Sequence, residues 1–425
     1  MWGKIFVIGF LCFASLTSFS QEEKARKIVE TLCSDAFYGR GYVNDGMNIA
    51  ANFVRDEFKK IGLKPFVNDT SYFQTFSYPV NVFPDTLEFK VNDKHLKPGV
   101  DFLIDEASGS FQGELLPVFI GPVHFTKKKL FTEAYNEIVS GNKNAFFVDL
   151  ESVDEKERPQ MMHQLRVLSK QAPVIFIQTA KFTWSVAGEQ FDYPIIYVKP
   201  GLIDRNSNLY LQVNATLNPQ FITKNVIGFL PSQKENADTL VFSAHFDHLG
   251  MMGTYPEKTI FPGGNDNASG TSMLITMADY FTKNPSDYNI IFMAFAGEEA
   301  GLFGSVNMVN SKDIDLSTIK FLINLDIMGS GEEGVTVVNG SIYQDEFNKL
   351  VSINNEKKYL TQIKSRGEAA NSDHYYFYKA GVPSIFIYTM GPNKNYHDVF
   401  DTYDALSFAA YNNIVQLLID FVGKL

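Results

Sequence analysis

Long apolar runs alternate with helical patterns over the second half of the chain. From about residue 223 the sequence contains five such runs: NVIGFLP, LVFSAHFDHLG, NIIFMAFAGEE, FLINLDIMG and PSIFIYT. Runs of this kind are expected of strands that are buried on both faces of a parallel sheet. Helical patterns lie between them, for example SGTSMLITMADYFTKN, in which Met273, Met277 and Phe281 recur every four residues. This alternation predicts a layered α/β domain with a mostly parallel central sheet.

The first half of the chain has a different pattern. Residues 22 to about 65 carry a helical periodicity that stops near Gly62, and the sequence then changes to the alternation typical of strands. From about residue 85 to 220, short apolar runs are separated by polar loops and by one charged helical segment, DEKERPQMMHQLRVL. We therefore expect residues 21–84 and 223–425 to form one domain, and residues 85–222 to form a β-rich domain inserted into it.

The first twenty residues predict export. They contain one lysine, a short apolar stretch and small residues before Gln21, which is the pattern of a signal peptide over residues 1–20. A periplasmic or extracellular location follows, and no later segment is apolar enough to predict stable membrane insertion. The formal charge is -11, from 37 Lys and Arg against 48 Asp and Glu. It argues against a nucleic-acid partner, because phosphate binding needs clustered cations.

Polar residues stand at the end of one apolar run, in AHFDHLG. Alternate residues of a strand face the same way, so His245 and Asp247 share a face while His248 points elsewhere. A metal-bound imidazole usually gives its other N–H to a carboxylate, which would make Asp247 the partner of His245 rather than a ligand. The alternative is a histidine and an aspartate that are paired for structure alone. For His248 we expect a structural role.

Carboxylates follow at three further places. Asp266 lies in PGGNDNASG just before a predicted helix, where the helix dipole alone would also favour it. Glu298 and Glu299 are adjacent and would repel each other unless cations or protons intervene, so we expect one to bind metal and the other to handle protons. Asp326 ends another apolar run, where burial of a lone carboxylate would be costly.

The stretch NYHDVFDTYD adds His397, with Asp398 and Asp401 as candidate orienting acids. Five candidate ligands result: His245, Asp266, Glu299, Asp326 and His397. Imidazole and carboxylate ligands without thiolate suit zinc, with Mn2+ or Co2+ as substitutes. Five ligands exceed the usual need of one catalytic zinc. We therefore expect two Zn2+ ions that share a bridging carboxylate and lie roughly 3.5–4 Å apart.

With these residues assembled, the chain resembles the co-catalytic zinc aminopeptidase family. The matching stretches, in the order of that family, are AHFDHLG, PGGNDNASG, AGEEAGLFGS, NLDIMG, NSDHYYF and YHDVFDTYD, over roughly residues 223–425. The resemblance implies the zinc-exopeptidase fold, a three-layer α-β-α sandwich with a mostly parallel central sheet. The β-rich insert is similar to a protease-associated domain.

The resemblance also implies a role for each ligand. Asp266 would bridge the two metals, with His245 and Asp326 on one and Glu299 and His397 on the other.

Glu298 is implied as the general base, and Asp247 again as the partner of His245. We therefore expect a secreted metallopeptidase that hydrolyses peptide substrates through a metal-activated water. Removal of N-terminal amino acids is the activity that the resemblance favours.

Two other functions stay open from the sequence. A glutaminyl cyclase-like acyltransferase would have a similar fold, but such enzymes carry tryptophan before the last histidine ligand, where this chain has Tyr396. A non-catalytic binding module would have no reason to keep Glu298.

Carboxypeptidases and dipeptidases need a cation for the substrate carboxylate, for which Arg366 is the candidate, although a loop position is the simpler interpretation. Asp373 and His374, in NSDHYYF, are assigned equally to the substrate pocket and to structural support.

Overall fold

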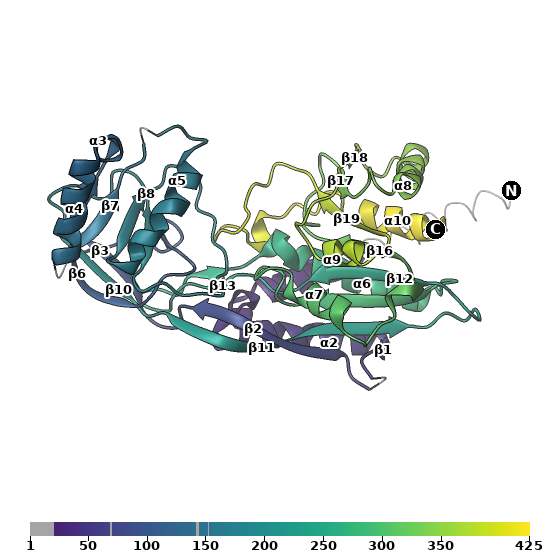
Figure 1. Ribbon diagram of the computed structural model, residues 1–425. Helices are drawn as coiled ribbons and strands as arrows, with labels where there is room; N and C mark the ends of the chain where they lie inside the picture. Colours follow the sequence, from purple (N-terminus) through teal and green to yellow (C-terminus); the bar gives the residue numbers. More distant parts are fainter. Residues whose placement is uncertain (1–20, 69, 142–143, 152) are drawn as a thin grey trace.

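Two large sheets form the framework of the protein. The computed structural model describes residues 21–68, 70–141, 144–151 and 153–425, so the predicted signal peptide lies outside the described residues. The described residues form a nine-stranded sheet, an eight-stranded sheet and a two-stranded pair. In Figure 1 the larger sheet lies on the right and the smaller sheet on the left, and β2 and β11 run between them along the bottom.

The larger sheet has the strand order β1-β11-β15-β12-β16-β19-β17-β18, and β2 also pairs with β11. Its strands are β1 (Lys64–Pro65), β2 (Phe73–Val82), β11 (Thr216–Leu230), β12 (Thr239–His245), β15 (Asn289–Phe295), β16 (Ile319–Leu325), β17 (Val335–Val338), β18 (Ile363–Ser365) and β19 (Ser384–Thr389). The four central strands, β15, β12, β16 and β19, are parallel, whereas β11 and β17 join them antiparallel. The prediction of a mostly parallel sheet is confirmed.

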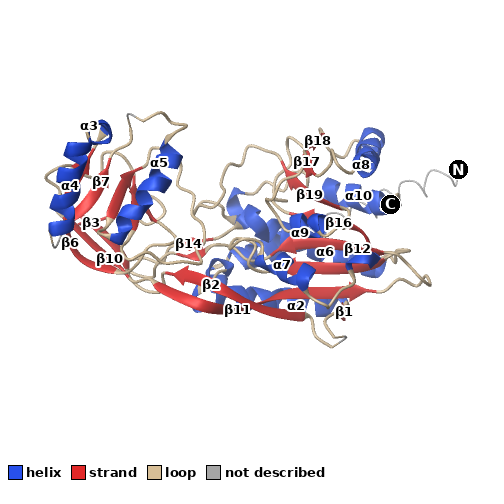
Figure 2. Ribbon diagram, in the orientation of Figure 1, coloured by secondary structure: helices blue, strands red, loops and turns tan. Residues whose placement is uncertain are grey.

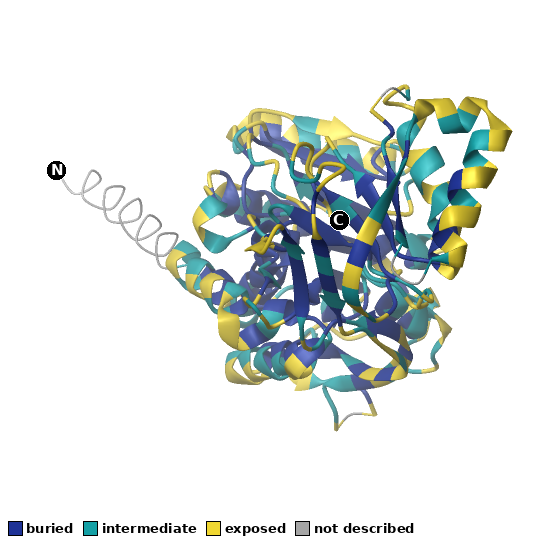
Figure 3. Ribbon diagram, turned by 90° about the vertical axis from the view of Figure 1, so that its left-hand side faces the viewer, coloured by how far each residue is buried: buried dark blue, intermediate teal, exposed yellow. Residues whose placement is uncertain are grey.

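Helices cover both faces of this sheet and make it the middle of three layers. One face packs against α2 (Gly46–Ile61), α6 (Gly270–Lys283), α8 (Gln344–Lys357) and α10 (Tyr411–Val422), and the other against α7 (Phe303–Asn310) and α9 (His374–Lys379). Along β15, Ile290, Phe292 and Ala294 face the first group, while Ile291, Met293 and Phe295 face the second. The central strands are almost entirely buried, and Figure 3 shows the buried residues of the protein in dark blue in its interior. The strands are mostly apolar because both of their faces are covered.

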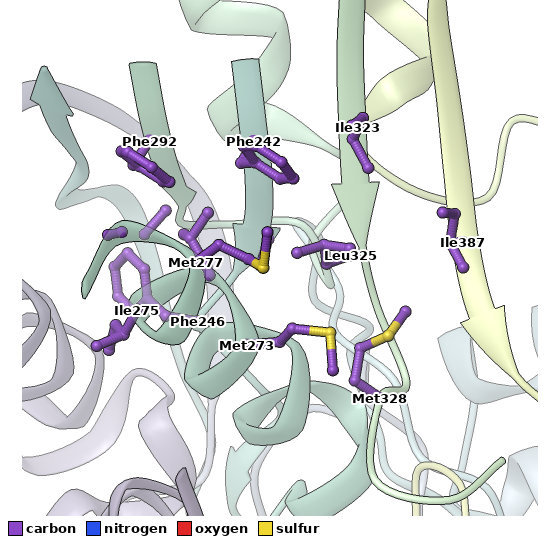
Figure 4. Packing of buried hydrophobic residues seen from close by; sticks show 14 of the residues in the cluster. Phe242, Phe246, Met273, Ile275, Met277, Phe292, Ile323, Leu325, Met328 and Ile387 are labelled. Atoms are coloured by element: carbon purple, nitrogen blue, oxygen red, sulfur yellow. The ribbon is translucent and has the colours of Figure 1, made fainter. Parts of the chain in front are cut away.

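Aromatic and methionine side chains pack between α6 and the sheet. Phe242 of β12 and Phe292 of β15 stack with ring centroids 5.8 Å apart. On α6, Met277 lies near Phe242, and Met273 lies near Leu325 and Met328 (Figure 4). Met273, Met277 and Phe281, which recur every four residues in the sequence, all lie on the buried face of α6. Residues 21–33 are also helical and add Ala25, Ile28 and Val29 to this core.

The smaller sheet has the order β4-β3-β10-β6-β7-β8-β9-β5. Its strands are β3 (Leu87–Val91), β4 (Lys94–His95), β5 (Phe102–Ile104), β6 (Phe111–Ile120), β7 (Asn144–Val148), β8 (Val174–Ile177), β9 (Ile195–Val198) and β10 (Leu209–Val213). Three helices accompany it, α3 (Pro122–Thr126), α4 (Lys128–Ser140) and α5 (Arg158–Leu165), and Figure 2 shows them in blue beside the red strands.

Only α5 was expected from the sequence. On α4 the buried residues are Ala134 and Ile138 alone, so the apolar stripe is too narrow to stand out among the polar residues. The two-stranded pair consists of β13 (Gly250–Met251) and β14 (Ile260–Phe261). None of the helices in the described part of the chain combines the length and the apolar character needed to cross a membrane.

A buried arginine ties the N-terminal segment to the loops that follow β12 and β14. Arg40 ends the turn η1 (Asp35–Arg40) and is 0% exposed. Its Nε donates to Phe246 O at 2.8 Å, its Nη1 to Leu32 O at 3.0 Å and Pro262 O at 2.6 Å, and its Nη2 to Gly263 O at 2.7 Å. One side chain therefore fixes the spacing of two loops that are neighbours only in the folded protein.

Removal of the Phe242 ring tests the core. We expect Phe242→Ala to lower the free energy of unfolding by about 3–5 kcal/mol, because it leaves a cavity between α6 and the sheet. Ile222→Ala is the control, since that side chain is 63% exposed and should change stability by less than about 0.5 kcal/mol. Urea denaturation measures both, and equal losses for the two variants would contradict this packing.

Removal of the Arg40 hydrogen-bond donors tests whether this side chain holds the loops after β12 and β14 together. We expect Arg40→Met to cost at least about 3 kcal/mol, because each buried carbonyl left without a donor costs roughly 1–3 kcal/mol. The exposed Arg205→Met serves as the control in the same denaturation experiment. A loss below about 1 kcal/mol for Arg40→Met would show that the loops keep their spacing without the guanidinium.

Candidate metal centre

All five candidate ligands lie at one edge of the larger sheet, beyond the carboxyl ends of its parallel strands. His245 ends β12, Glu299 follows β15 and Asp326 follows β16. Asp266 lies in the irregular turn η4 (Gly264–Ser269), just before α6, and His397 lies in the loop after β19. Because parallel strands end at the same edge, residues far apart in the sequence meet there.

Asp266 lies between the two histidines. Its Oδ1 is 3.2 Å from His245 Nε2, and its Oδ2 is 3.2 Å from His397 Nε2. Asp326 Oδ1 is 3.4 Å from the same nitrogen of His245, and Glu299 Oε2 is 3.0 Å from that of His397. The five residues therefore form two groups that share one carboxylate.

Each histidine is held through its other nitrogen by a main-chain carbonyl. His245 Nδ1 donates to Asp247 O at 3.2 Å, and His397 Nδ1 donates to Trp184 O at 2.9 Å. A carbonyl oxygen only accepts hydrogen bonds, so these contacts place a proton on each Nδ1. Both Nε2 atoms are thereby directed at the carboxylates.

The local charge favours bound protons or cations. Asp266, Glu298, Glu299 and Asp326 bring four carboxylates into a buried or half-buried space. Burial alone would lower the pKa of His397, but the carboxylates of Glu299 and Asp266 raise it to about 11. The same anions that favour a proton on this ring favour a cation between the ring and the acids.

The donor set fits metal ions on further grounds. Asp326 Oδ2 accepts from Ser372 Oγ at 3.0 Å, while its buried Oδ1 receives no hydrogen bond. Metal-binding atoms of His245, Asp266 and Glu299 lie within 4.8 Å of one another, as do those of His245, Glu298 and Asp326. Carboxylate oxygen and imidazole nitrogen are the ligands that zinc takes in catalytic sites without thiolate.

Glu298 and Asp247 lie against this cluster. Burial raises the pKa of Glu298 well above its usual range, and the charge of Glu299 raises it further. The Asp247 carboxylate accepts from the main-chain N–H groups of Glu298 and Glu299, both at 3.3 Å, and its Oδ1 is 3.7 Å from His245 Nδ1. Asp247 thus orients His245 through its carbonyl and the glutamate turn through its carboxylate.

Three residues beside the ligands have partners that the sequence did not indicate. His248 donates from Nδ1 to Glu299 Oε1 at 2.7 Å, so its structural role includes holding that acid. Asp401 accepts from the main-chain N–H groups of Asn265 and Asp266 instead of from His397. Asp398 instead forms an ion pair with Lys181.

The three residues whose roles were left open differ in their surroundings. Asp373 and His374 are 0% exposed and lie at the start of α9, and burial lowers the pKa of His374 to about 4. Burial also raises the pKa of Asp373 to about 7. Arg366 is exposed in the loop after β18. Tyr396, which the sequence marked only as a contrast with tryptophan, stacks on the His397 ring with centroids 3.9 Å apart.

Part of the chain is similar to a known peptidase family. Residues 225–422 match the profile of Peptidase family M28. The chain is 30% identical over 212 residues to aminopeptidase YwaD of Bacillus subtilis strain 168, a match that covers 48% of this chain and 44% of that protein. The match spans about half the length of such curated relatives.

Two solved structures share the fold along nearly the whole chain. BSAP, a zinc aminopeptidase from Bacillus subtilis, superposes with a TM-score of 0.65 at 18% identity, over 95% of this chain and 94% of that one. The aminopeptidase from Aneurinibacillus sp. strain AM-1 superposes with a TM-score of 0.63 at 17% identity, over 95% and 93% of the two chains. The predicted fold, a mostly parallel α/β sandwich with a second, β-rich sheet, is confirmed. The residues that match Peptidase family M28, 225–422, include the whole cluster of acids and histidines, so this part of the chain is similar to that family.

Proposed function

We propose that the protein is an exported zinc aminopeptidase, which removes single amino acids from the N-terminus of peptides. The observation that carries this proposal is the position of Asp266 between His245 and His397, each of which faces a further carboxylate. The names of the M28 relatives, which include aminopeptidases, support it. Export rests on the signal-peptide pattern of residues 1–20.

The ligand assignment follows the two groups of contacts. One Zn2+ would be held by His245, Asp326 and Asp266, and the other by Glu299, His397 and Asp266, with Mn2+ or Co2+ as substitutes. When bound, the metal ions supply Lewis-acid chemistry, which acidifies water and polarises the carbonyl of the scissile bond.

Glu298 is the proposed general base. It lies half-buried beside the acids of the cluster, and burial raises its pKa, which makes its carboxylate a stronger proton acceptor. The protonated carboxyl group then gives this proton to the nitrogen of the leaving amine. Asp247 keeps Glu298 in place by accepting its main-chain N–H.

The excess of carboxylates also accounts for a preference for free N-termini. A substrate ammonium group is a cation that the acids around Asp266 and Glu299 attract, whereas an acetylated N-terminus offers no charge. Binding of this group beside the metals would present the first peptide bond for cleavage.

The role of Glu298 is tested by Glu298→Gln, which removes the proton acceptor and keeps the size of the side chain. We expect kcat to fall by about 100- to 10,000-fold, with the metal content unchanged. Glu235→Gln, at an exposed glutamate, is the matched control. Initial rates on a leucyl p-nitroanilide and metal analysis of the same samples measure the two effects. Wild-type kcat in Glu298→Gln would exclude this residue as the base.

The reaction is tested with pairs of unblocked and N-acetylated peptides, read by mass spectrometry. We expect loss of single N-terminal residues from the unblocked peptides only, and no products after treatment with a chelator. Ammonia loss from an N-terminal glutaminyl peptide without chain cleavage would indicate the glutaminyl cyclase-like alternative. Turnover of no peptide by metal-replete protein would favour the binding module.

A further inference from the structure

A segment of the smaller sheet's region contacts the loop that carries His397. Between β8 and β9 the chain crosses to the larger sheet, and we call residues 181–186 the bridging segment. Trp184 N donates to His397 O at 2.9 Å, while His397 Nδ1 donates to Trp184 O at 2.9 Å. The backbone of Trp184 therefore contacts His397 on both its main chain and its ring.

This contact decides which nitrogen of His397 faces the metal centre. The Trp184 carbonyl keeps the proton on Nδ1, which leaves Nε2 directed at Asp266 Oδ2 and Glu299 Oε2. His397 also has a positive φ of 52°, an uncommon conformation for a residue with a side chain. Its orientation therefore relies on contacts from outside its own loop.

The tryptophan is itself fixed at both ends. Its Nε1 donates to Ile104 O, in β5, at 3.0 Å, and its ring stacks on Phe261 of β14 with centroids 4.7 Å apart. The side chain is buried, so its position is set jointly by the smaller sheet and by the strand just before Asp266. A carbonyl held in this way is a rigid acceptor for the histidine.

Lys181 also holds the loop that carries His397. Its Nζ donates to Lys394 O at 2.6 Å and to Tyr396 O at 3.3 Å, and it lies 2.5 Å from Asp398 Oδ2. These three contacts hold the chain on both sides of His397. The other histidine, His245, is oriented by Asp247 on its own loop.

We propose that the bridging segment positions His397, and that the smaller sheet thereby controls filling of the metal position formed by His397 and Glu299. This inference rests on the metal centre proposed above. It makes the two metal positions unequal: one is built within the larger sheet, and the other depends on a contact from residues 181–186. Trp184 and Lys181 are positioning residues, since they act through His397.

The chain contains a reporter for this contact. It has two tryptophans, Trp2 and Trp184, and Trp2 lies in the predicted signal peptide, so protein that begins at Gln21 has Trp184 as its single indole. We would titrate this metal-free mature protein with Zn2+ and follow both bound metal and Trp184 emission. Two binding steps are expected, with the change in emission confined to the step that fills the His397 position.

Variants of the bridging segment test whether filling of the His397 metal position depends on this segment. In the mature protein, Lys181→Met should weaken the step that fills the His397 position by about 10- to 100-fold and leave the other step within about twofold. Lys181→Arg keeps the cation and should restore most of the affinity. Lys170→Met, at an exposed lysine of the smaller sheet's region, should match the parent protein. Trp184→Ala, followed by bound metal alone, should affect the same step.

The outcomes separate the two proposals. Unchanged constants for both steps in Lys181→Met and Trp184→Ala would overturn the positioning role and leave the metal centre standing. Equal weakening of both steps would also overturn it, since a general loss of structure would act on both. Failure of the parent protein to bind Zn2+ would overturn the metal centre and this inference with it.

Discussion

Four carboxylates share one small space at the edge of the larger sheet, and the rest of the site is arranged around this concentration of negative charge. Two unit charges 4 Å apart repel by about 4 kcal/mol at an effective dielectric constant of 20. Several such pairs rival the net stability of about 5–15 kcal/mol that a folded domain possesses. Asp266, Glu298, Glu299 and Asp326 can therefore stay together only when protons or cations lie between them.

The parallel sheet makes this crowding achievable. Strands β12, β15, β16 and β19 are buried on both faces, so their positions are fixed by packing along their whole length. Their ends carry His245, Glu299 and Asp326 to one edge, where the turn η4 and the loop after β19 add Asp266 and His397. Arg40 and the bridging segment add constraints from outside the sheet, through hydrogen bonds to Gly263 O and to His397. The core therefore supplies the rigidity that holds the charges in place.

The sequence indicated the strands and the candidate ligands because both leave local signals. An uninterrupted apolar run such as that of β15 needs burial on both faces, and polar residues directly after several such runs must meet at one edge. Orientation of the side chains leaves no local signal. The partner of His397 is a carbonyl 213 residues earlier in the chain, whereas the adjacent Asp398 and Asp401 contact other groups. The role of Arg40, which rests on four main-chain carbonyls, is likewise invisible in residue spacing.

The most direct test of this account is an anomalous diffraction measurement at the zinc edge, on crystals of the zinc-replete protein. We expect two peaks roughly 3.5–4 Å apart. One should lie beside His245 and Asp326, the other beside Glu299 and His397, with Asp266 between them. A single peak, or peaks elsewhere in the protein, would contradict the shared role of Asp266 and the two-metal centre built on it.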